Sequence, residues 1–215
     1  FTGAKYVIPT INGTSALHIS LKMSGVKEKD EVIVPTLTYI ATVNSIIYCG
    51  ASPIFMDVES NLNLSIKKVI KFLIEETITK NKITYNKKTK KRISAILLVH
   101  IFGNAVDIKP LLKICRKKNI KIIEDASESL GTFYNKNYLK GKHTGTIGYL
   151  GCLSFNGNKI ITTGGGGAIL TNSKKLYKYC NYLCDQAKDN SLLSIHNEVG
   201  FNYKLSNVHS AIGCA

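Results

Sequence analysis

Short apolar runs alternate with helical patterns along the first 125 residues, and this alternation constrains the fold more than any other feature of the sequence. Four runs are short, rich in β-branched residues and bounded by turn-forming residues, as buried strands are: residues 31–35, 52–58, 93–100 and 120–125. The alternating segments carry apolar residues at helical spacing, and most of them close on Gly or Asn: residues 14–25, 39–50, 65–76 and 108–119. Strands joined by helices favour a parallel sheet with right-handed crossovers, so we predict an α/β layer protein.

The pattern changes after residue 150. Residues 151–155 and 167–171 predict two short strands around a run of glycines, and a helix is predicted over roughly 173–187. No segment has the composition of a linker and no repeat is present, so one domain is expected. Because the sequence starts at Phe1 and stops at "AIGCA", inside a helical pattern, we expect a fragment of a longer protein.

The net charge of +15 raises the question of an anionic partner. Much of the charge lies in residues 80–92, a lysine-rich segment without apolar periodicity. Tyr85 is the one aromatic residue in it, which is too few for a base-stacking platform, so a solvated surface loop is favoured over a nucleic-acid patch. No apolar run approaches the roughly 20 residues of a membrane span and no leader pattern begins the sequence, which predicts a cytoplasmic location.

The six cysteines are dispersed, and most lie in apolar stretches, so we expect reduced, structural thiols. Cys180 and Cys184 are four residues apart on a predicted helix, which would place two ligands on one helix face. No second Cys or His pair lies nearby at the spacing of a zinc site, and therefore no metal is predicted.

Ligands of open α/β sheets bind beyond the carboxyl ends of the strands, and two segments there carry candidate chemistry. "NGTSALH" (12–18) places Thr14 and Ser15 at the start of a helix, where free N–H groups form an anion site; helix capping alone also explains such a turn. "IIEDASESLG" (122–131) ends a strand with Glu124 and Asp125. A carboxylate at that point serves as a metal ligand, a base, the partner of a protonated heterocycle or a helix cap.

A third segment, "SFNGNKIITTGGGG" (154–167), sets Lys159 ahead of four consecutive glycines. In a P-loop the lysine follows the glycines and precedes a helix, whereas here the order is reversed and a strand follows. A lysine amine is also the nucleophile of imine chemistry. The glycines favour close approach of the backbone to a ligand or a neighbouring strand.

One cofactor uses all of these groups. Pyridoxal phosphate needs an anion cradle, an amine, a carboxylate beside the pyridine nitrogen and a flat group against the ring. Thr14 with Ser15, Lys159, Asp125 and Tyr39 supply these in turn. Each signal alone is weak, but together they indicate a pyridoxal phosphate site.

With these motifs, and with "PTLTYIATVNSIIYCGASPIFMDV", "VHIFGN" and "GFNYKLSNVHSAIG", the sequence resembles the DegT/DnrJ/EryC1/StrS nucleotide-sugar aminotransferases over nearly its whole length. The resemblance implies the large domain of fold type I (aspartate aminotransferase-like), a mostly parallel seven-stranded sheet between helices. Residues 1–215 would be this pyridoxal phosphate-binding domain, truncated at both ends and without the smaller C-terminal domain. Gly165 stands where the wider family commonly has glutamate, as in the branch that makes 4-amino sugars.

The resemblance also implies roles for individual residues. Lys159 would form the Schiff base, Asp125 would pair with the pyridine nitrogen, and Tyr39 would stack on the ring. The implied ligands of the phosphate are Thr14, Ser15 and Ser154, together with Asn202 of the neighbouring subunit. Because Asn202 would reach the site of the other subunit, the resemblance also implies a homodimer with active sites shared between subunits. Glu128 falls where many relatives have His or Gln near the cofactor hydroxyl.

The implied activity is transfer of an amino group from glutamate to a 4-keto-6-deoxy sugar on UDP or GDP, for bacterial surface glycans. Three alternatives remain. A related sugar dehydratase uses the same cofactor but has histidine in place of the lysine, so Lys159 argues against it. A non-catalytic regulatory or scaffold protein of the same fold would bind the cofactor without turnover. A nucleic-acid-binding domain would rest on the charge alone.

Overall fold

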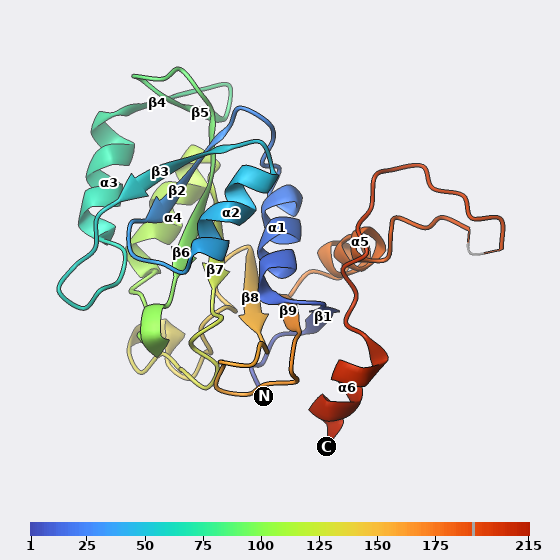
Figure 1. Cartoon of the computed structure of the whole chain (residues 1–215). Coiled ribbons are helices and arrows are strands. Elements are labelled where there is room, and N and C mark those ends of the chain that lie inside the picture. The colour runs from blue at the N-terminus through green and yellow to red at the C-terminus, as the bar shows by residue number, and fades with distance from the viewer. Residues whose placement is uncertain (191) are drawn as a thin grey trace.

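A seven-stranded sheet forms the centre of the computed structural model, which describes residues 1–190 and 192–215 (Figure 1). The strand order is β1-β9-β8-β7-β6-β2-β3. β9 pairs antiparallel with both of its neighbours, and β8, β7, β6, β2 and β3 pair in parallel, which confirms the mostly parallel seven-stranded sheet. The strands are β1 (Tyr6–Thr10), β2 (Glu31–Pro35), β3 (Ser52–Met56), β6 (Ile93–Val99), β7 (Lys121–Asp125), β8 (Leu150–Ser154) and β9 (Gly167–Thr171).

Helices cover both faces of the sheet. The covering helices are α1 (Gly13–Met23), α2 (Ile40–Tyr48), α3 (Ile66–Glu75), α4 (Lys109–Lys118) and α5 (Lys174–Cys184). A further helix, α6 (Asn207–Cys214), has no buried residue, and two short 3-10 turns are η1 (Ile101–Gly103) and η2 (Asn137–Leu139). Each helix predicted from the sequence is present, and the helical pattern at the end of the chain is α6. Among the residues described, no helix has both the length and the apolar character needed to cross a lipid bilayer.

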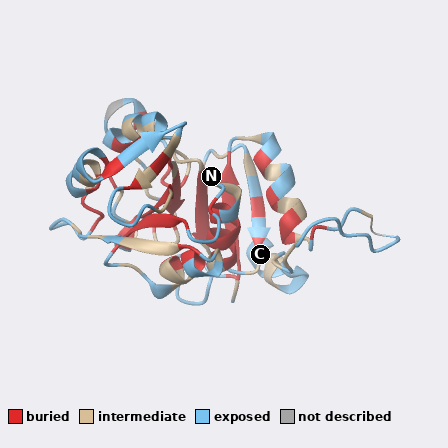
Figure 2. Cartoon of the chain, turned by 90° about the horizontal axis from the view of Figure 1, so that it is seen from above, coloured by how far each residue is buried: buried red, intermediate tan, exposed pale blue. Residues whose placement is uncertain are grey.

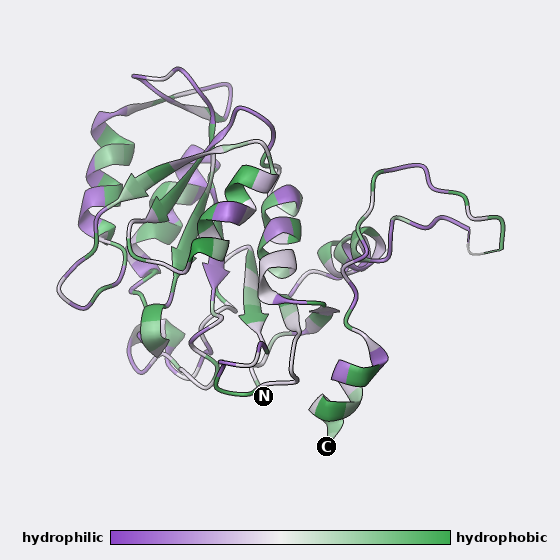
Figure 3. Cartoon of the chain, in the orientation of Figure 1, coloured by the Kyte–Doolittle hydropathy of each residue, from purple (hydrophilic) through white to green (hydrophobic). Residues whose placement is uncertain are grey.

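Two apolar cores lie on opposite faces of the sheet. Val32 and Val34 of β2 pack in the core formed with α1, α2 and α5, whereas Ile33 packs in the core formed with α3 and α4. This division follows from the pleat, which sends successive side chains to opposite faces. Buried residues accordingly run through the middle of the sheet (Figure 2), and the apolar sides of the helices face it (Figure 3). Burial raises the pKa of Cys180 and Cys184 to about 12, so both thiols stay protonated in the core.

The lysine-rich segment 80–92 is more ordered than the sequence predicts. β4 (Thr77–Lys80) and β5 (Ile83–Asn86) form an antiparallel hairpin whose two turn residues both have positive φ, as a type I′ turn requires. Asn86 is buried, and its side chain donates to Glu31 Oε2 at 2.9 Å at the start of β2. The expectation of a fully solvated loop was therefore wrong for residues 83–86.

Two further features were not foreseen. The strand β1 was not predicted, because its alternation over five residues includes a proline. The segment between α5 and α6 extends away from the body of the domain, and α6 buries no residue against it (Figure 1). The rings of Phe201 and Tyr203 in this segment lie against His18 of α1, and the Ile11 N–H donates to the Tyr203 carbonyl oxygen at 2.8 Å.

The central strand β6 supplies a test of this core. Leu97 is fully buried there, so Leu97→Ala is expected to lower the free energy of unfolding by about 2–5 kcal/mol, through lost burial and the cavity left behind. The control is Ile74→Ala on α3, where the side chain is 62% exposed and the expected change is about 0.5 kcal/mol or less. Urea unfolding of both variants measures the difference, and equal losses would contradict this assignment of the core.

Candidate functional site

A cavity of about 270 Å³ lies at the carboxyl ends of β6, β7 and β8 and at the amino-terminal ends of α1 and α2. This is the sheet edge at which ligands of open α/β sheets bind. Six of the residues predicted for the site line it: Thr14, Tyr39, Asp125, Glu128, Ser154 and Lys159. Residues from five separate segments of the sequence thus meet around one space.

The first turn of α1 forms one wall of the cavity, packed against two serines. A Cβ added to Gly13 would lie 2.9 Å from Ser154 Cβ and 3.4 Å from Ser127 Oγ, so a larger residue at position 13 would displace these side chains. The amino-terminal end of the helix presents N–H groups and the positive end of its dipole. Gly13, Thr14, Ser127 and Ser154 therefore form an anion cradle, which is the name used below. Ser127 was missed in the sequence, where it stands two residues after Asp125.

Ser15, the second predicted hydroxyl of this turn, does not line the cavity. Its side chain is buried, and its backbone N–H donates to Asn12 Oδ1 at 2.8 Å, so the helix cap already uses that donor. The sequence could not separate the two adjacent hydroxyls, because the distinction depends on which side of the helix faces the sheet edge.

Asp125 ends β7 with its carboxylate held on both oxygens. Oδ2 accepts the hydroxyl of Thr42 at 2.9 Å, and Oδ1 accepts the backbone N–H of Ser127 at 3.1 Å. The Thr42 hydroxyl in turn accepts from Thr38 Oγ1 at 2.8 Å. The residue is buried, and these donors fix the carboxylate at the edge of the cavity. Thr42 was not predicted, since it lies 83 positions away in the sequence.

Lys159 lies on the turn after β8 with its amine inside the site. The side chain is only 13% exposed, and Nζ lies 3.7 Å from Glu128 Oε1 and 5.8 Å from the centroid of the Tyr39 ring. The other carboxylate oxygen of Glu128 accepts the backbone N–H of Phe102 at 2.8 Å. Amine, aromatic ring and a second carboxylate therefore face one another.

The last glycine of the run after Lys159 lies against the anion cradle, whereas Gly164 and Gly165 lie near His209 of α6. A Cβ at Gly167 would lie 2.6 Å from the backbone carbon of Asn12 and 2.7 Å from the backbone nitrogen of Gly13. Gly164 and Gly166 have φ values of +81° and +117°, a conformation that favours glycine. The expected close approach of the backbone is confirmed, and it brings β9 against the start of α1.

Asn202 lies apart from these residues. It is exposed in the segment between α5 and α6, where it bridges to Asp185, and it does not line the cavity of its own chain. Across residues 1–190 and 192–215, no group of three or more His, Cys, Asp or Glu side chains is arranged to hold a metal ion.

The cavity fits pyridoxal phosphate. The anion cradle depends on the missing side chain of Gly13, as a phosphate against the backbone would require. Lys159 supplies an amine, Asp125 supplies an acceptor for a protonated ring nitrogen, and Tyr39 supplies a flat surface. These are the groups that the cofactor needs, within one cavity.

Comparison with known proteins gives a consistent result. Residues 1–215 match the DegT/DnrJ/EryC1/StrS aminotransferase family. The GDP-perosamine synthase of Escherichia coli O157:H7 is 41% identical over 212 residues, which cover 98% of this chain and 52% of that protein. A putative pyridoxal phosphate-dependent aminotransferase of Bacillus subtilis, EpsN, is 35% identical over 99% of this chain and 51% of that protein.

Among solved structures, the crystal structure of a DegT DnrJ EryC1 StrS aminotransferase from Brucella abortus superposes with a TM-score of 0.85 at 26% identity. It matches 98% of this chain and 53% of its own length. The chain thus spans about half the length of the relatives that it matches. Sequence, fold and the geometry of the cavity agree: the chain belongs to the DegT/DnrJ/EryC1/StrS aminotransferase family, whose cofactor is pyridoxal phosphate.

Proposed function

We propose that the protein is a pyridoxal phosphate-dependent aminotransferase that moves an amino group from glutamate to a nucleotide-linked 4-keto-6-deoxy sugar for bacterial surface glycans. Residues 1–215 would be its cofactor-binding large domain. The observation that carries the proposal is the meeting of the Lys159 amine, the Asp125 carboxylate and the anion cradle around one cavity of about 270 Å³. Membership of the family and a share of about half the relatives' length support it.

In this proposal, separate groups of residues hold the phosphate and the ring of the cofactor. The anion cradle, with the hydroxyls of Thr14, Ser127 and Ser154, binds the phosphate. Tyr39, the N-cap residue of α2, covers one side of the ring. The bound cofactor supplies an aldehyde that amines attack and a ring that accepts an electron pair.

Asp125 keeps a proton on the ring nitrogen. Both of its oxygens already accept one hydrogen bond each, from Thr42 and from the Ser127 N–H, and these contacts fix the orientation of the carboxylate. A carboxylate oxygen has a second lone pair, which remains for the ring N–H. The negative charge at this position favours a positively charged ring, and that charge makes electron withdrawal effective.

Lys159 Nζ is the amine that would hold the cofactor through its aldehyde, and as a free amine it would accept and return a proton at the substrate carbon. Its placement in a mostly enclosed space beside Tyr39 favours contact with the ring rather than with solvent. Glu128 Oε1, at 3.7 Å, faces the amine and holds it in the cavity when it is protonated.

The acceptor is an anionic nucleotide sugar. The relative at 41% identity is named GDP-perosamine synthase, which makes a GDP-linked sugar the first candidate for this chain. The net charge of +15 is compatible with a diphosphate substrate. In the balanced reaction glutamate leaves as 2-oxoglutarate and the keto carbon of the sugar takes the amino group.

A homodimer completes the proposal. Asn202 was predicted to reach the phosphate of the neighbouring subunit, and its exposed position outside the cavity of its own chain supports this role. The extended segment that carries it also exposes Leu192 and Val199, at 92% and 80%, and these apolar side chains suit burial against a second copy.

Removal of the reactive amine tests the proposed chemistry. The wild type with pyridoxal phosphate is expected to show a visible absorption band and, after borohydride reduction, a covalent cofactor adduct that survives unfolding. Lys159→Ala should lose both, because no other amine of the described residues lines the cavity. Lys67→Ala, an exposed lysine on α3, is the control and should keep both. A wild type that binds no cofactor would refute the proposal.

Neutralising the carboxylate tests the role of Asp125. Asp125→Asn should keep the shape of the side chain but lower kcat/KM by about 10²–10³-fold, the range found when one preorganised electrostatic stabiliser is removed. Cofactor binding should weaken much less. Asp107→Asn, an exposed carboxylate before α4, serves as control. Steady-state rates of 2-oxoglutarate formation measure the effect, and wild-type rates in Asp125→Asn would contradict the role.

A substrate panel separates the enzyme from its alternative. With glutamate as donor, we expect a GDP-linked 4-keto-6-deoxyhexose to be aminated faster than its UDP-linked counterpart, with one 2-oxoglutarate formed per amino sugar. Mass spectrometry of the nucleotide sugar and coupled detection of 2-oxoglutarate give both quantities. Full cofactor loading without turnover of any keto sugar would instead favour the non-catalytic regulatory or scaffold protein.

A further inference from the structure

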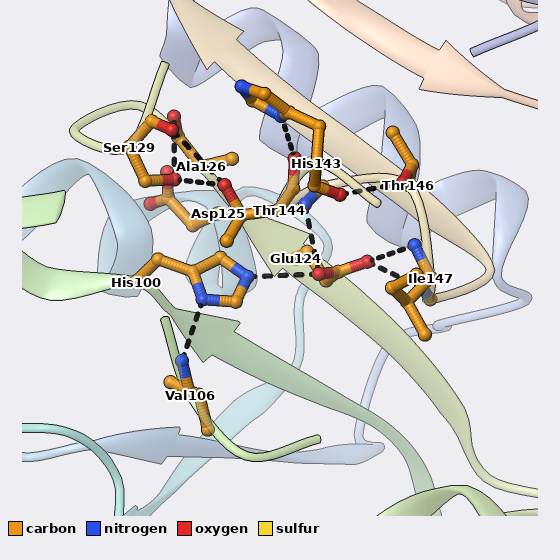
Figure 4. Close-up of polar contacts among 12 residues, drawn as sticks. His100, Val106, Glu124, Asp125, Ala126, Ser129, His143, Thr144, Thr146 and Ile147 are labelled. Atoms are coloured by element: carbon orange, nitrogen blue, oxygen red, sulfur yellow. Dashed lines mark hydrogen bonds and ion pairs between the residues drawn. The ribbon is translucent and has the colours of Figure 1, made fainter. Parts of the chain in front are cut away.

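A second acidic residue lies beside the proposed site and has no part in the chemistry above. Glu124 precedes Asp125 at the end of β7, and its side chain and that of His100 are both completely buried. Figure 4 shows His100 and Ile147 on opposite sides of the Glu124 carboxylate. A charge buried this deeply is costly unless hydrogen bonds compensate for it, so its contacts call for an explanation.

Four donors converge on the Glu124 carboxylate. Oε2 accepts from His100 Nε2 at 2.9 Å and from the Gly145 N–H at 2.9 Å. Oε1 accepts from the N–H groups of Ile147 and Gly148 at 2.7 Å and 2.5 Å. Burial by itself would raise the pKa of Glu124, but these donors outweigh it and lower the pKa below the usual value. The carboxylate is therefore ionised and ties residues 145–148 to β7.

The ring of His100 is held at both of its nitrogens. Its Nδ1 accepts the backbone N–H of Val106 at 3.1 Å, so that nitrogen carries no proton, and Nε2–H donates to Glu124. The backbone N–H of His100 donates to the carbonyl oxygen of Asp125 at 3.0 Å. His100 thus contacts both consecutive acidic residues, Glu124 through its side chain and Asp125 through its backbone.

The turn between His100 and Val106 leads to the second carboxylate of the cavity. Within this turn Phe102 has a φ of 51°, a left-handed conformation that is uncommon for a bulky residue, and its N–H points at Glu128 Oε2. The contact of Nδ1 with Val106 closes the turn and so holds that N–H in place. The other oxygen of Glu128 faces Lys159.

We propose that Glu124 is a positioning residue: through His100 it fixes the end of β7 and the turn 100–106, and thereby places Asp125 and Glu128 around the cofactor cavity. The inference rests on the proposed function, because the consequence of misplacing these two carboxylates is weaker binding of pyridoxal phosphate. Glu124 itself does not line the cavity and touches no reacting atom.

Glu124→Gln tests this role with almost no change in volume. The amide N–H₂ must replace one oxygen, and it then faces two donors, so at least two of the four hydrogen bonds are lost whichever way the amide lies. We expect binding of pyridoxal phosphate to weaken about 10- to 100-fold, the range seen when partners that orient a metal ligand are removed. Equilibrium dialysis measures the affinity.

A second measurement uses the protein without cofactor. Hydrogen exchange at the amides of Phe102 and Val106 is expected to accelerate in Glu124→Gln by a larger factor than in the rest of the sheet, because the turn loses its anchor. Exchange at the amides of β3, at the far edge of the sheet, should stay as in the wild type. Unchanged exchange at the turn would overturn the proposal.

Two control variants separate positioning from a general loss of stability. Leu73→Ala removes a fully buried side chain from α3, which makes none of these hydrogen bonds, so it should lower stability while changing cofactor affinity less than threefold. His100→Gln keeps an N–H donor near the position of Nε2 and should bind the cofactor more tightly than His100→Ala. Equal affinity losses in Glu124→Gln and in a Leu73→Ala protein of equal stability would also overturn the proposal.

The two proposals can fail separately. If the wild type binds no pyridoxal phosphate, the proposed function fails, but the exchange experiment still decides whether Glu124 anchors the turn. If the wild type binds the cofactor and Glu124→Gln binds it equally well, the positioning role fails and the proposed function stands.

Discussion

The strand β7 ends with two consecutive carboxylates, and the pleat sends them to opposite faces of the sheet. Asp125 faces the cavity, where the Thr42 hydroxyl and the Ser127 N–H hold it. Glu124 faces the interior, where four donors surround it. A single strand end therefore joins the candidate site to the loops that support it, and a shift of this strand by one residue would exchange the two environments.

The energetic demands of the two positions differ. At Glu124 a full charge is compensated entirely within the protein, and this is possible because the backbone of residues 145–148 turns three N–H groups toward it. At Asp125 compensation is partial, since one lone pair on each oxygen is left for other partners. In the proposed function, this remaining capacity of Asp125 would accept the protonated ring nitrogen of the cofactor.

Much of the architecture could be predicted because strand and helix periods differ and because the turns carry clear signals. The strands predicted over residues 31–35 and 93–100 were observed as β2 and β6. The hairpin β4–β5 was missed because β5 runs directly into the lysine-rich residues 87–92, although its buried Thr84 and Asn86 alternate as a strand requires. The overall composition of a segment does not reveal which of its side chains are buried.

The candidate site was predictable only in part, for a related physical reason. Lys159 and Asp125 stand out in the sequence because each follows a strand and is chemically reactive. Thr42 and His100 carry no such signal, since a threonine in a helix and a histidine after a strand are common, and their roles depend on contacts across 83 and 24 positions. Ser15 was predicted for the site but does not line the cavity. A hydroxyl is suited to bind a phosphate, but the residue type does not establish which way the side chain points.

The loop that carries Lys159 joins the neighbouring antiparallel strands β8 and β9, so its two ends lie side by side. Ser154 and Gly167 are paired partners of β8 and β9, and the Phe155 N–H donates to the Gly166 carbonyl oxygen at 2.9 Å. These contacts hold the two ends of the loop together. Ser154, at the start of the loop, belongs to the anion cradle, whereas Lys159 lies in the middle of the loop. The reach of the amine can therefore change with the length of the loop while the cradle keeps its shape, and the entropy of closure changes only slowly with that length.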